Sequence, residues 1–270
     1  MTRLAEIHLD ISEAKPSLNF YVDRLGMRLM AVEQLPGGED TLYTLSFKTG
    51  ACLKLRRRDK KEQRLQGYQP RAEDVYWKIG ITVLDVDLAW KRLKASGIQV
   101  SDPQQFFDIG YLCHLDDPDG YCIELLQHKF KSNFKPRLPE ESEPLGSRPN
   151  LGQVSLDVSS IENSLAFYRD QIGLNLLSHQ PVPDRSFSLW FLGQEDLQPP
   201  SDAVEAIENR EWLWALPETT LELRAFDNPQ PLRRPHPPLS ELGFRGIGFS
   251  RAGAVPNRLQ DPDGVELWLS

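Results

Sequence analysis

The chain opens with an alternation of apolar and polar residues. Residues 3–12 read RLAEIHLDIS, which puts Glu6, His8 and Asp10 on one face of an extended chain and Ile7 and Leu9 on the other. A period of two is typical of a β-strand with one buried face. We therefore predict a strand whose three polar side chains lie opposite the core.

A helical pattern follows over residues 14–25. Apolar residues recur there at the spacing of one helix face, and Gly26 stands where a left-handed C-cap is favoured. Three strand-like segments come next, the first two separated by a PGG turn. They cover residues 27–33, 41–47 and 51–57. The predicted order is a βαβββ unit.

The same order returns from residue 75 onward. The strand YWKIGITV precedes a helix over residues 87–96 that Gly97 closes, and a strand is expected near Gln99. The segments GYLCHL and YCIELLQ then flank a DPDG sequence, which suits a tight turn. These segments predict a second βαβββ unit.

The opening pattern is repeated later in the chain. LDISEAKPSLNFYVDRLGMRL from Leu9 is matched by LDVSSIENSLAFYRDQIGLNL from Leu156, an offset of 147 residues. Repetition at this distance predicts a duplicated domain. The copy is imperfect, because residues 194–210 look like an insertion. The fourth unit is truncated, since no room for a helix lies between the strand GIGF and the last DPDG.

Between the copies lies a segment rich in proline, serine and charge, without periodicity. We interpret it as a linker. The predicted division is a first domain over residues 1–130, a linker over residues 131–149 and a second domain over residues 150–270.

Composition narrows the classes of function. A formal charge of −8 argues against nucleic-acid binding, and the basic stretch over residues 54–64 contains acidic residues and is interpreted as a solvated connecting loop. No window approaches the ~18 apolar residues that a membrane span needs. Cys52, Cys113 and Cys122 cannot all pair with one another, which favours a reducing, cytoplasmic setting.

Two motifs, each present twice, resemble a known family. SLNFY and SLAFY, followed by LG and IG, lie in helices after alternating strands, and DPDGYCIEL and DPDGVELWL precede closing strands. Together they resemble the vicinal-oxygen-chelate superfamily, which includes glyoxalases, bleomycin-resistance proteins and extradiol dioxygenases. The resemblance covers nearly the whole chain. It implies an α+β fold in which paired βαβββ modules form cup-shaped mixed β-sheets, duplicated here into two domains.

In that family a divalent metal lies inside the cup, held by His or Glu from the first and last strands of the units. The resemblance transfers these positions in the first domain to Glu6, Lys54, Lys78 and Glu124, which are expected to face one cavity. An ammonium group has no lone pair, so two lysines argue against a metal. We therefore expect no cofactor in this cup.

The second domain offers a still poorer ligand set at the transferred positions, namely Gln153, Glu222, Gly246 and Trp268. Its cup is also expected to lack a metal. The two histidines and one carboxylate of an iron dioxygenase are not found on these strands, which disfavours extradiol ring cleavage.

His8 is the candidate for a shifted metal site, because it shares the strand face of Glu6 and could act with Glu6 and Glu124. The alternative is a structural histidine that is hydrogen-bonded within the sheet. The equivalent position in the copy is Ser155, which gives no support for a metal ligand.

Two cysteines are placed on the same inward face. Cys52 and Cys122 stand two residues before Lys54 and Glu124, so a period of two aligns them. Core packing is favoured over a nucleophilic thiolate, because no His–Asp partner is apparent.

The favoured function is metal-independent binding of a small, partly anionic or aromatic molecule in the first-domain cup, as in bleomycin-resistance proteins. The expected ligand-binding residues are Glu6, His8, Cys52, Lys54, Lys78, Cys122 and Glu124. A purely structural network of buried ion pairs is the alternative interpretation of the four charged residues.

Two rival functions stay open. One is an enzyme, either a glyoxalase-like metal-dependent lyase, isomerase or dioxygenase using Glu6, His8 and Glu124, or a metal-free enzyme with Lys78 or Glu124 as the acid–base group. The other is a protein-interaction scaffold with both cups closed. The expected partner is a small molecule rather than nucleic acid or membrane, and the chain is expected to be a monomer or homodimer.

Overall fold

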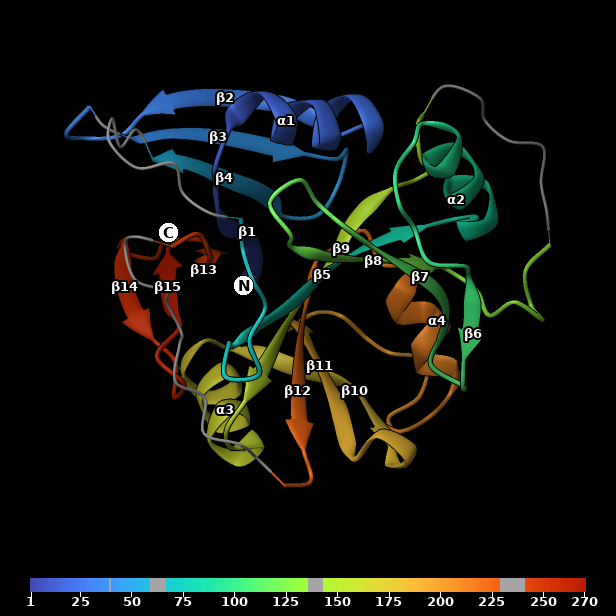
Figure 1. Cartoon of the computed structure of the whole chain (residues 1–270). Coiled ribbons are helices and arrows are strands. Elements are labelled where there is room, and N and C mark those ends of the chain that lie inside the picture. The colour runs from blue at the N-terminus through green and yellow to red at the C-terminus, as the bar shows by residue number, and fades with distance from the viewer. Residues whose placement is uncertain (39, 59–66, 136–142, 229–240) are drawn as a thin grey trace.

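The computed structural model describes residues 1–38, 40–58, 67–135, 143–228 and 241–270. Two mixed β-sheets make up most of the molecule, and the few helices are short (Figure 1). The predicted α+β class is confirmed. Each predicted unit is called a module below, numbered one to four along the chain.

Modules one and two both follow the predicted order. Module one contains β1 (Thr2–Ile11), α1 (Ala14–Leu18) continued by the π-helical turn η1 (Asn19–Arg24), β2 (Arg28–Gln34), β3 (Asp40–Ser46) and β4 (Cys52–Arg58). Module two contains β5 (Tyr76–Val83), α2 (Val86–Ala95), β6 (Gln104–Phe106), β7 (Gly110–Asp116) and β8 (Cys122–Gln127). The strand expected near Gln99 lies further on, at β6, and Val100 forms only an isolated bridge to Leu115.

Modules three and four form the copy. Module three contains β9 (Asn150–Val158), α3 (Ile161–Ala166) continued by the π-helical turn η2 (Phe167–Gln171), β10 (Leu174–Val182), the 3-10 turn η3 (Pro183–Arg185), β11 (Phe187–Gln194), α4 (Glu208–Trp214) and β12 (Thr220–Phe226). Module four contains β13 (Phe244–Arg251), β14 (Asn257–Gln260) and β15 (Glu266–Leu269). No helix separates β13 from β14 in this described part of the chain, so the predicted truncation is confirmed.

The sheets combine modules from both copies. Module one pairs with module four in a seven-stranded sheet of order β14-β15-β13-β1-β4-β3-β2. Module two pairs with module three in an eight-stranded sheet of order β10-β11-β12-β9-β5-β8-β7-β6. The expectation that modules one and two share one cup is therefore wrong, whereas the division at residues 131–149 remains a prediction. Residues 136–142 of that linker lie outside the described residues.

The physical reason lies in the first strand of each module. β1 pairs in parallel with β4 of its own module, and β9 pairs likewise with β12, which leaves the other edge of each first strand unpaired within the module. That edge needs a partner for its backbone groups. β13 supplies it for β1 and β5 supplies it for β9, both antiparallel. A strand from any other module offers the same backbone groups, so residue patterns do not select the partner.

The apolar faces of the two sheets share one core. Ile7 and Leu9 of β1 are fully buried, as are Ile79 of β5 and Val154 of β9, and all belong to the same hydrophobic cluster. The apolar side chains of β1 thus face the core, as the alternation over residues 3–12 predicted. Because successive strand residues point to opposite faces, Glu6 and His8 lie on the face of the seven-stranded sheet away from this core.

The basic stretch is not a loop throughout. Its first part belongs to β4, where Arg56 and Arg58 lie 2.8 Å and 3.7 Å from the carboxylate oxygens of the buried Asp10. Residues 59–64 lie outside the described residues. Among the described helices, none has the length and apolar character that crossing a membrane requires.

Candidate functional site

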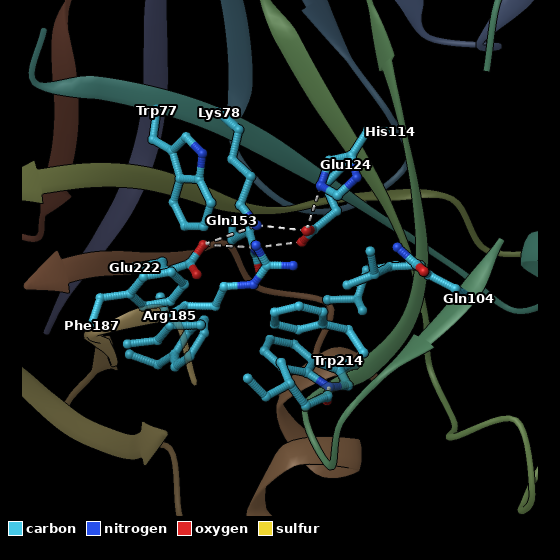
Figure 2. A pocket seen from close by; sticks show the side chains of 16 residues that line it. Trp77, Lys78, Gln104, His114, Glu124, Gln153, Arg185, Phe187, Trp214 and Glu222 are labelled. Carbon is cyan, nitrogen blue, oxygen red and sulfur yellow. Dashed lines mark hydrogen bonds and ion pairs between the residues drawn. The ribbon is translucent and has the colours of Figure 1, made fainter. Parts of the chain in front are cut away.

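A pocket with a volume of about 280 Å³ lies against the eight-stranded sheet. Aromatic side chains from three strands and one helix form much of its wall, and polar side chains from five strands gather at one end (Figure 2). The aromatic residues are Trp77, Phe106, Phe187, Phe191 and Trp214. The polar end, called the pocket floor below, consists of Lys78, His114, Glu124, Gln153 and Glu222. The pocket therefore combines apolar walls with a charged floor.

The centre of the pocket floor is an ammonium between two carboxylates. Lys78 Nζ on β5 lies 2.6 Å from Glu124 Oε2 on β8 and 3.9 Å from Glu222 Oε2 on β12. The side chains of all three are at most 5% exposed. Buried ions of this kind need close partners, because desolvation of each charge is costly. The lysine supplies that partner for both carboxylates.

Gln153 on β9 joins the two carboxylates from the other side. Its Nε2 donates to Glu124 Oε1 at 3.2 Å and to Glu222 Oε2 at 2.9 Å. The side chain fits because β5 carries Gly80 opposite Gln153, where a Cβ atom would lie 2.3 Å from Cγ of Gln153. Any larger residue at position 80 would collide with this hydrogen-bonded amide.

Two further side chains complete the polar contacts. Ser155 on β9 donates its hydroxyl to Glu222. His114 on β7 faces Glu124 in the β7–β8 register, and its Nε2 lies 3.1 Å from Glu124 Oε2. Glu124 thus contacts Lys78, Gln153 and His114.

Trp77 forms the wall beside the pocket floor. Lys78 Nζ lies 4.1 Å from the Trp77 ring centroid, and the guanidinium carbon of Arg224 lies 3.7 Å from it. Arg224 is fixed by two hydrogen bonds of 2.7 Å and 2.8 Å to Asp157. These cation–π contacts and ion pairs hold the indole in place.

The electrostatics of the pocket floor shift the pKa values of its two carboxyl groups in opposite directions. Burial alone would raise the pKa of Glu124, but the charge of Lys78 and the hydrogen bond with His114 outweigh it, so this pKa is lowered and the group is ionised. Burial raises the pKa of Glu222, and the nearby Glu124 charge adds to the effect. Burial would lower the pKa of Lys78, yet the two carboxylates raise it overall. Lys78 is therefore a cation.

The family resemblance implies a divalent metal at this position, and the residues present do not fit one. Lys78 has no lone pair to offer while it is protonated, and its ammonium already neutralises Glu124. Gln153 aims amide hydrogens rather than its oxygen at both carboxylates. Within the described part of the chain, no group of three or more His, Cys, Asp or Glu side chains is arranged to hold a metal ion.

The predicted ligand-binding residues fall into two separate groups. Lys78, Glu124 and Cys122 belong to the eight-stranded sheet, whereas Glu6, His8, Lys54 and Cys52 belong to the seven-stranded sheet. The expectation of one shared cavity is wrong, because β1 and β4 pair with module four instead of module two. For the same reason Glu124 lies in a different sheet from Glu6 and His8, so these three residues do not form a metal site.

In the seven-stranded sheet, Glu6 has its own partners. His8 Nε2 lies 2.9 Å from Glu6 Oε2, and Lys54 Nζ lies 3.3 Å from Glu6 Oε1. The hydrogen bond with His8 lowers the pKa of Glu6, and the charges of His8 and Lys54 add to it. The His8 ring also packs on Trp268, with ring centroids 4.3 Å apart. Gly248 leaves space for Glu6, since a Cβ there would lie 2.9 Å from Glu6 Cβ.

The cysteines do not share an inward face either, since Cys52 is on β4 and Cys122 on β8. Both are partly buried free thiols. Burial raises the pKa of Cys122 to about 11, against the opposing charge of Lys78. A thiol with this pKa is a poor nucleophile near neutral pH.

Sequence reasoning missed several residues of the pocket. His114 was given no role, although counting outward from the DPDG turn pairs it with Glu124. Gln153 and Glu222 were assigned to a different cup. Arg185, which extends into the pocket (Figure 2), carries no signal that would distinguish it from other surface arginines. The aromatic walls come from three strands and helix α4, whose packing partners the sequence pattern does not reveal.

Comparisons with known proteins agree with this architecture. The family model for the Glyoxalase/Bleomycin resistance protein/Dioxygenase superfamily matches residues 3–125. Lactoylglutathione lyase of Oryza sativa subsp. japonica is 33% identical over 81 residues, which are 30% of this chain and 22% of that protein. Glyoxalase I of Saccharomyces cerevisiae is 23% identical over 226 residues, which are 74% of this chain and 65% of that protein. A probable chloroplastic lactoylglutathione lyase of Arabidopsis thaliana is 22% identical over 71% of this chain and 50% of that protein. The chain thus spans less than two thirds of the length of these relatives.

Solved structures extend the likeness to the whole chain. Glyoxalase I from Zea mays superposes with a TM-score of 0.69 at 18% identity, covering 100% of this chain and 92% of that one. A putative dioxygenase from Bacillus subtilis superposes with a TM-score of 0.61 at 12% identity, covering 99% of this chain and 84% of that one. At these identities the likeness establishes the fold. Residues 3–125 therefore match the model of the Glyoxalase/Bleomycin resistance protein/Dioxygenase superfamily, and the chain as a whole has the duplicated glyoxalase fold.

Proposed function

We propose that this protein binds a small organic molecule in the pocket of the eight-stranded sheet without a metal ion. The observation that carries the proposal is the position of Lys78, whose Nζ lies 2.6 Å from Glu124 and 3.9 Å from Glu222. A protonated lysine there takes the place of a metal cation, because it neutralises Glu124 and lies close to Glu222. The pocket above it is then available to a ligand.

The shape and lining of the pocket support a small ligand with an aromatic or apolar body. Its volume of about 280 Å³ is just below the usual range of ligand pockets, which is roughly 300–1,000 Å³. Trp77, Phe187, Phe191 and Trp214 offer ring faces and edges for packing. Gln104 and Arg185 are exposed and His114 is half-buried, so these polar side chains are available to a polar end of the ligand.

Calorimetric titration with 2-naphthamide, a neutral aromatic amide, tests this proposal. The protein is dialysed against EDTA and titrated before and after addition of zinc, nickel, iron(II) or manganese. We expect binding in the metal-free protein and no change on adding metal. Binding that occurs only after metal is added, or no binding in either state, would contradict the proposal.

A matched pair of variants locates the binding. Trp77→Ala removes a pocket wall, whereas Trp90→Ala removes a similarly half-buried indole that stacks with Lys94 on α2. We expect about tenfold weaker binding for Trp77→Ala, since an aromatic contact is worth roughly 1 kcal/mol, and no change for Trp90→Ala. Equal effects of the two would place the ligand elsewhere.

A metal-free acid–base enzyme is the second candidate, and the divergent behaviour of Glu124 and Glu222 favours it. Two carboxyl groups with pKa values pushed in opposite directions are typical of an acid–base pair. Lys78 fits the role of base poorly, because its pKa is raised. The names of the plant relatives suggest S-lactoylglutathione as the first substrate to assay.

The decisive comparison is Glu222→Gln against the exposed Glu208→Gln. An acid–base role for Glu222 predicts turnover of S-lactoylglutathione in EDTA that Glu222→Gln abolishes and Glu208→Gln leaves intact. Absence of turnover in the wild type would remove this candidate substrate and leave the binding proposal unaffected.

The remaining expectations belong to this proposal too. The presence of an open pocket weighs against a scaffold with both cups closed. Three free thiols, Cys52, Cys113 and Cys122, support the cytoplasmic setting expected from cysteine usage.

A further inference from the structure

Arg185 occupies a well-defined position at the pocket. It is the last residue of η3, the 3-10 turn that joins β10 to β11. The next residue, Ser186, has a left-handed backbone with φ +53°, which a residue other than glycine adopts at some energetic cost. The Ser186 amide donates to the Pro183 carbonyl at 3.1 Å, and the Asp227 amide donates to the Ser186 carbonyl at 3.0 Å. These bonds fix the turn to the end of β12.

The guanidinium of Arg185 extends from this turn into the pocket (Figure 2). Three cationic or basic side chains line the pocket among the described residues, namely Lys78, His114 and Arg185. Lys78 and His114 both contact Glu124. No hydrogen bond or ion pair joins Arg185 to another residue within the described ranges. Arg185 is thus the cation of the pocket that is available to a ligand.

Glu222 does not neutralise Arg185. Its carboxyl group is held by Ser155 and Gln153 and lies 3.9 Å from Lys78. These contacts direct the Glu222 carboxyl group toward β9 and Lys78. Lys78 lies between Glu124 and Glu222, so Arg185 is the pocket cation that has no carboxylate partner among the described residues and can pair with an anionic group of a ligand.

We infer that the ligand is an aromatic or apolar molecule with a single carboxylate-type anionic group, and that Arg185 binds this group. The inference rests on the proposed function and names its ligand class. A guanidinium binds a carboxylate through two parallel hydrogen bonds, and such charge-assisted bonds are stronger than neutral ones. The body of the ligand packs between the aromatic walls while the anionic group binds the Arg185 guanidinium inside the pocket.

The test compares two probes of the same shape and different charge. 2-Naphthoate and 2-naphthamide differ in a carboxylate against a neutral amide on the same bicyclic ring. Both are titrated calorimetrically into wild-type protein, Arg185→Met, Arg185→Lys and the control Arg258→Met. Arg258 is an exposed arginine on β14 in the other sheet. Circular dichroism melts confirm that each variant is folded.

We expect wild-type protein and Arg258→Met to bind 2-naphthoate on the order of tenfold more tightly than 2-naphthamide, a ratio typical of a partly exposed charge-assisted bond. Arg185→Met is expected to lose the preference while still binding the amide, and Arg185→Lys to keep part of it. The preference should also decrease at high salt, because exposed charges are screened.

The outcomes separate the inference from the function on which it rests. If both probes bind wild type equally, or if Arg185→Met keeps the preference for the carboxylate, the inference is wrong and the pocket remains a binding site for neutral ligands. If neither probe binds wild type, the proposed function itself is contradicted, and the inference is lost with it.

Discussion

The hydroxyl of Tyr21 donates a hydrogen bond to the carboxyl group of Asp117 at 2.9 Å, and the same pair recurs in the copy as Tyr168 and Asp261 at 2.7 Å. Each tyrosine belongs to an FY motif and each aspartate to a DPDG motif. The two motifs are therefore direct partners, and they join the helical segment of one module to the turn of the next. Amides at Asp119 and Tyr121 also donate to Asp117, and those at Asp263 and Val265 donate to Asp261.

Tyr21→Phe is expected to destabilise the protein by about 1–3 kcal/mol, because it leaves the buried Asp117 without one of its donors. Urea denaturation at pH 7 measures the change. Tyr43→Phe is the control, since Tyr43 is a half-buried tyrosine on β3. An effect of Tyr21→Phe no larger than that of Tyr43→Phe would contradict a structural role for the motif pair.

The pH dependence of stability should report on Asp117. Burial raises its pKa from 3.8 to about 7, so the folded state holds this proton more tightly than the unfolded chain does. The contribution of Asp117 to stability is then fully present below about pH 4 and is lost as the pH rises to about 7. Asp117→Asn removes the titration while keeping an oxygen that accepts the two amide hydrogen bonds.

Urea denaturation of wild type and Asp117→Asn at pH 5 and pH 8 tests this sign. We expect wild type to lose roughly 2–3 kcal/mol relative to the variant between these pH values. Asp261, whose pKa burial raises to about 6, titrates in both proteins and cancels from the comparison. A constant difference between the two proteins would show that Asp117 does not titrate in this range.

Local patterns were sufficient to predict most of the fold. The alternation around Ile7 and the helical spacing around Tyr21 each gave the correct element, because burial of one face sets the period of a strand or helix. The repeat from Leu9 to Leu156 gave the duplication. Residues that lie close together across one turn, such as His114 and Glu124, were also within reach of sequence reasoning.

The pairing of modules could not be predicted from the sequence, and the candidate site depends on this pairing. Lys78 and Glu124 belong to one module, but Gln153 and Glu222 come from the next, and only the β5–β9 pairing brings these four together. The backbone hydrogen bonds along an unpaired strand edge do not depend on which side chains the strand carries. The pattern therefore could not distinguish this arrangement from one that joins Lys78 to Glu6.

The buried ion pair should show strong energetic coupling. Lys78→Met is expected to cost about 3–5 kcal/mol, because it leaves two buried carboxyl groups without their cation. The double variant Lys78→Met, Glu124→Gln should recover part of this loss, since it also removes the unpaired charge. Urea denaturation of both single variants and the double variant gives the coupling energy.

Lys94→Met is the control for this cycle, because Lys94 and Asp102 form an exposed pair at 3.3 Å. Such a pair is worth about 0–1 kcal/mol. Additive effects of the Lys78 and Glu124 substitutions, or a cost no greater than that of Lys94→Met, would contradict the account of the pocket floor.

The thiol of Cys122 should be unreactive in the folded protein. Burial raises its pKa to about 11, which makes the thiolate on the order of 100-fold scarcer near neutral pH than for an ordinary thiol. Peptide mass spectrometry after iodoacetamide treatment at pH 7.5 compares native protein with protein in urea. Equal alkylation of Cys122 in the two states would show that the thiol is exposed and activated.

The central claim is that Lys78 takes the place of a metal ion in the eight-stranded sheet. Elemental analysis tests it most directly, on untagged protein incubated with zinc, nickel, iron(II) and manganese and then dialysed. Lys78→His serves as a reference, because an imidazole beside His114, Glu124 and Glu222 would supply a donor set suited to zinc. We predict no stoichiometric metal in wild type and a gain of zinc in Lys78→His. A stoichiometric metal in wild type that Glu124→Ala loses would contradict the account.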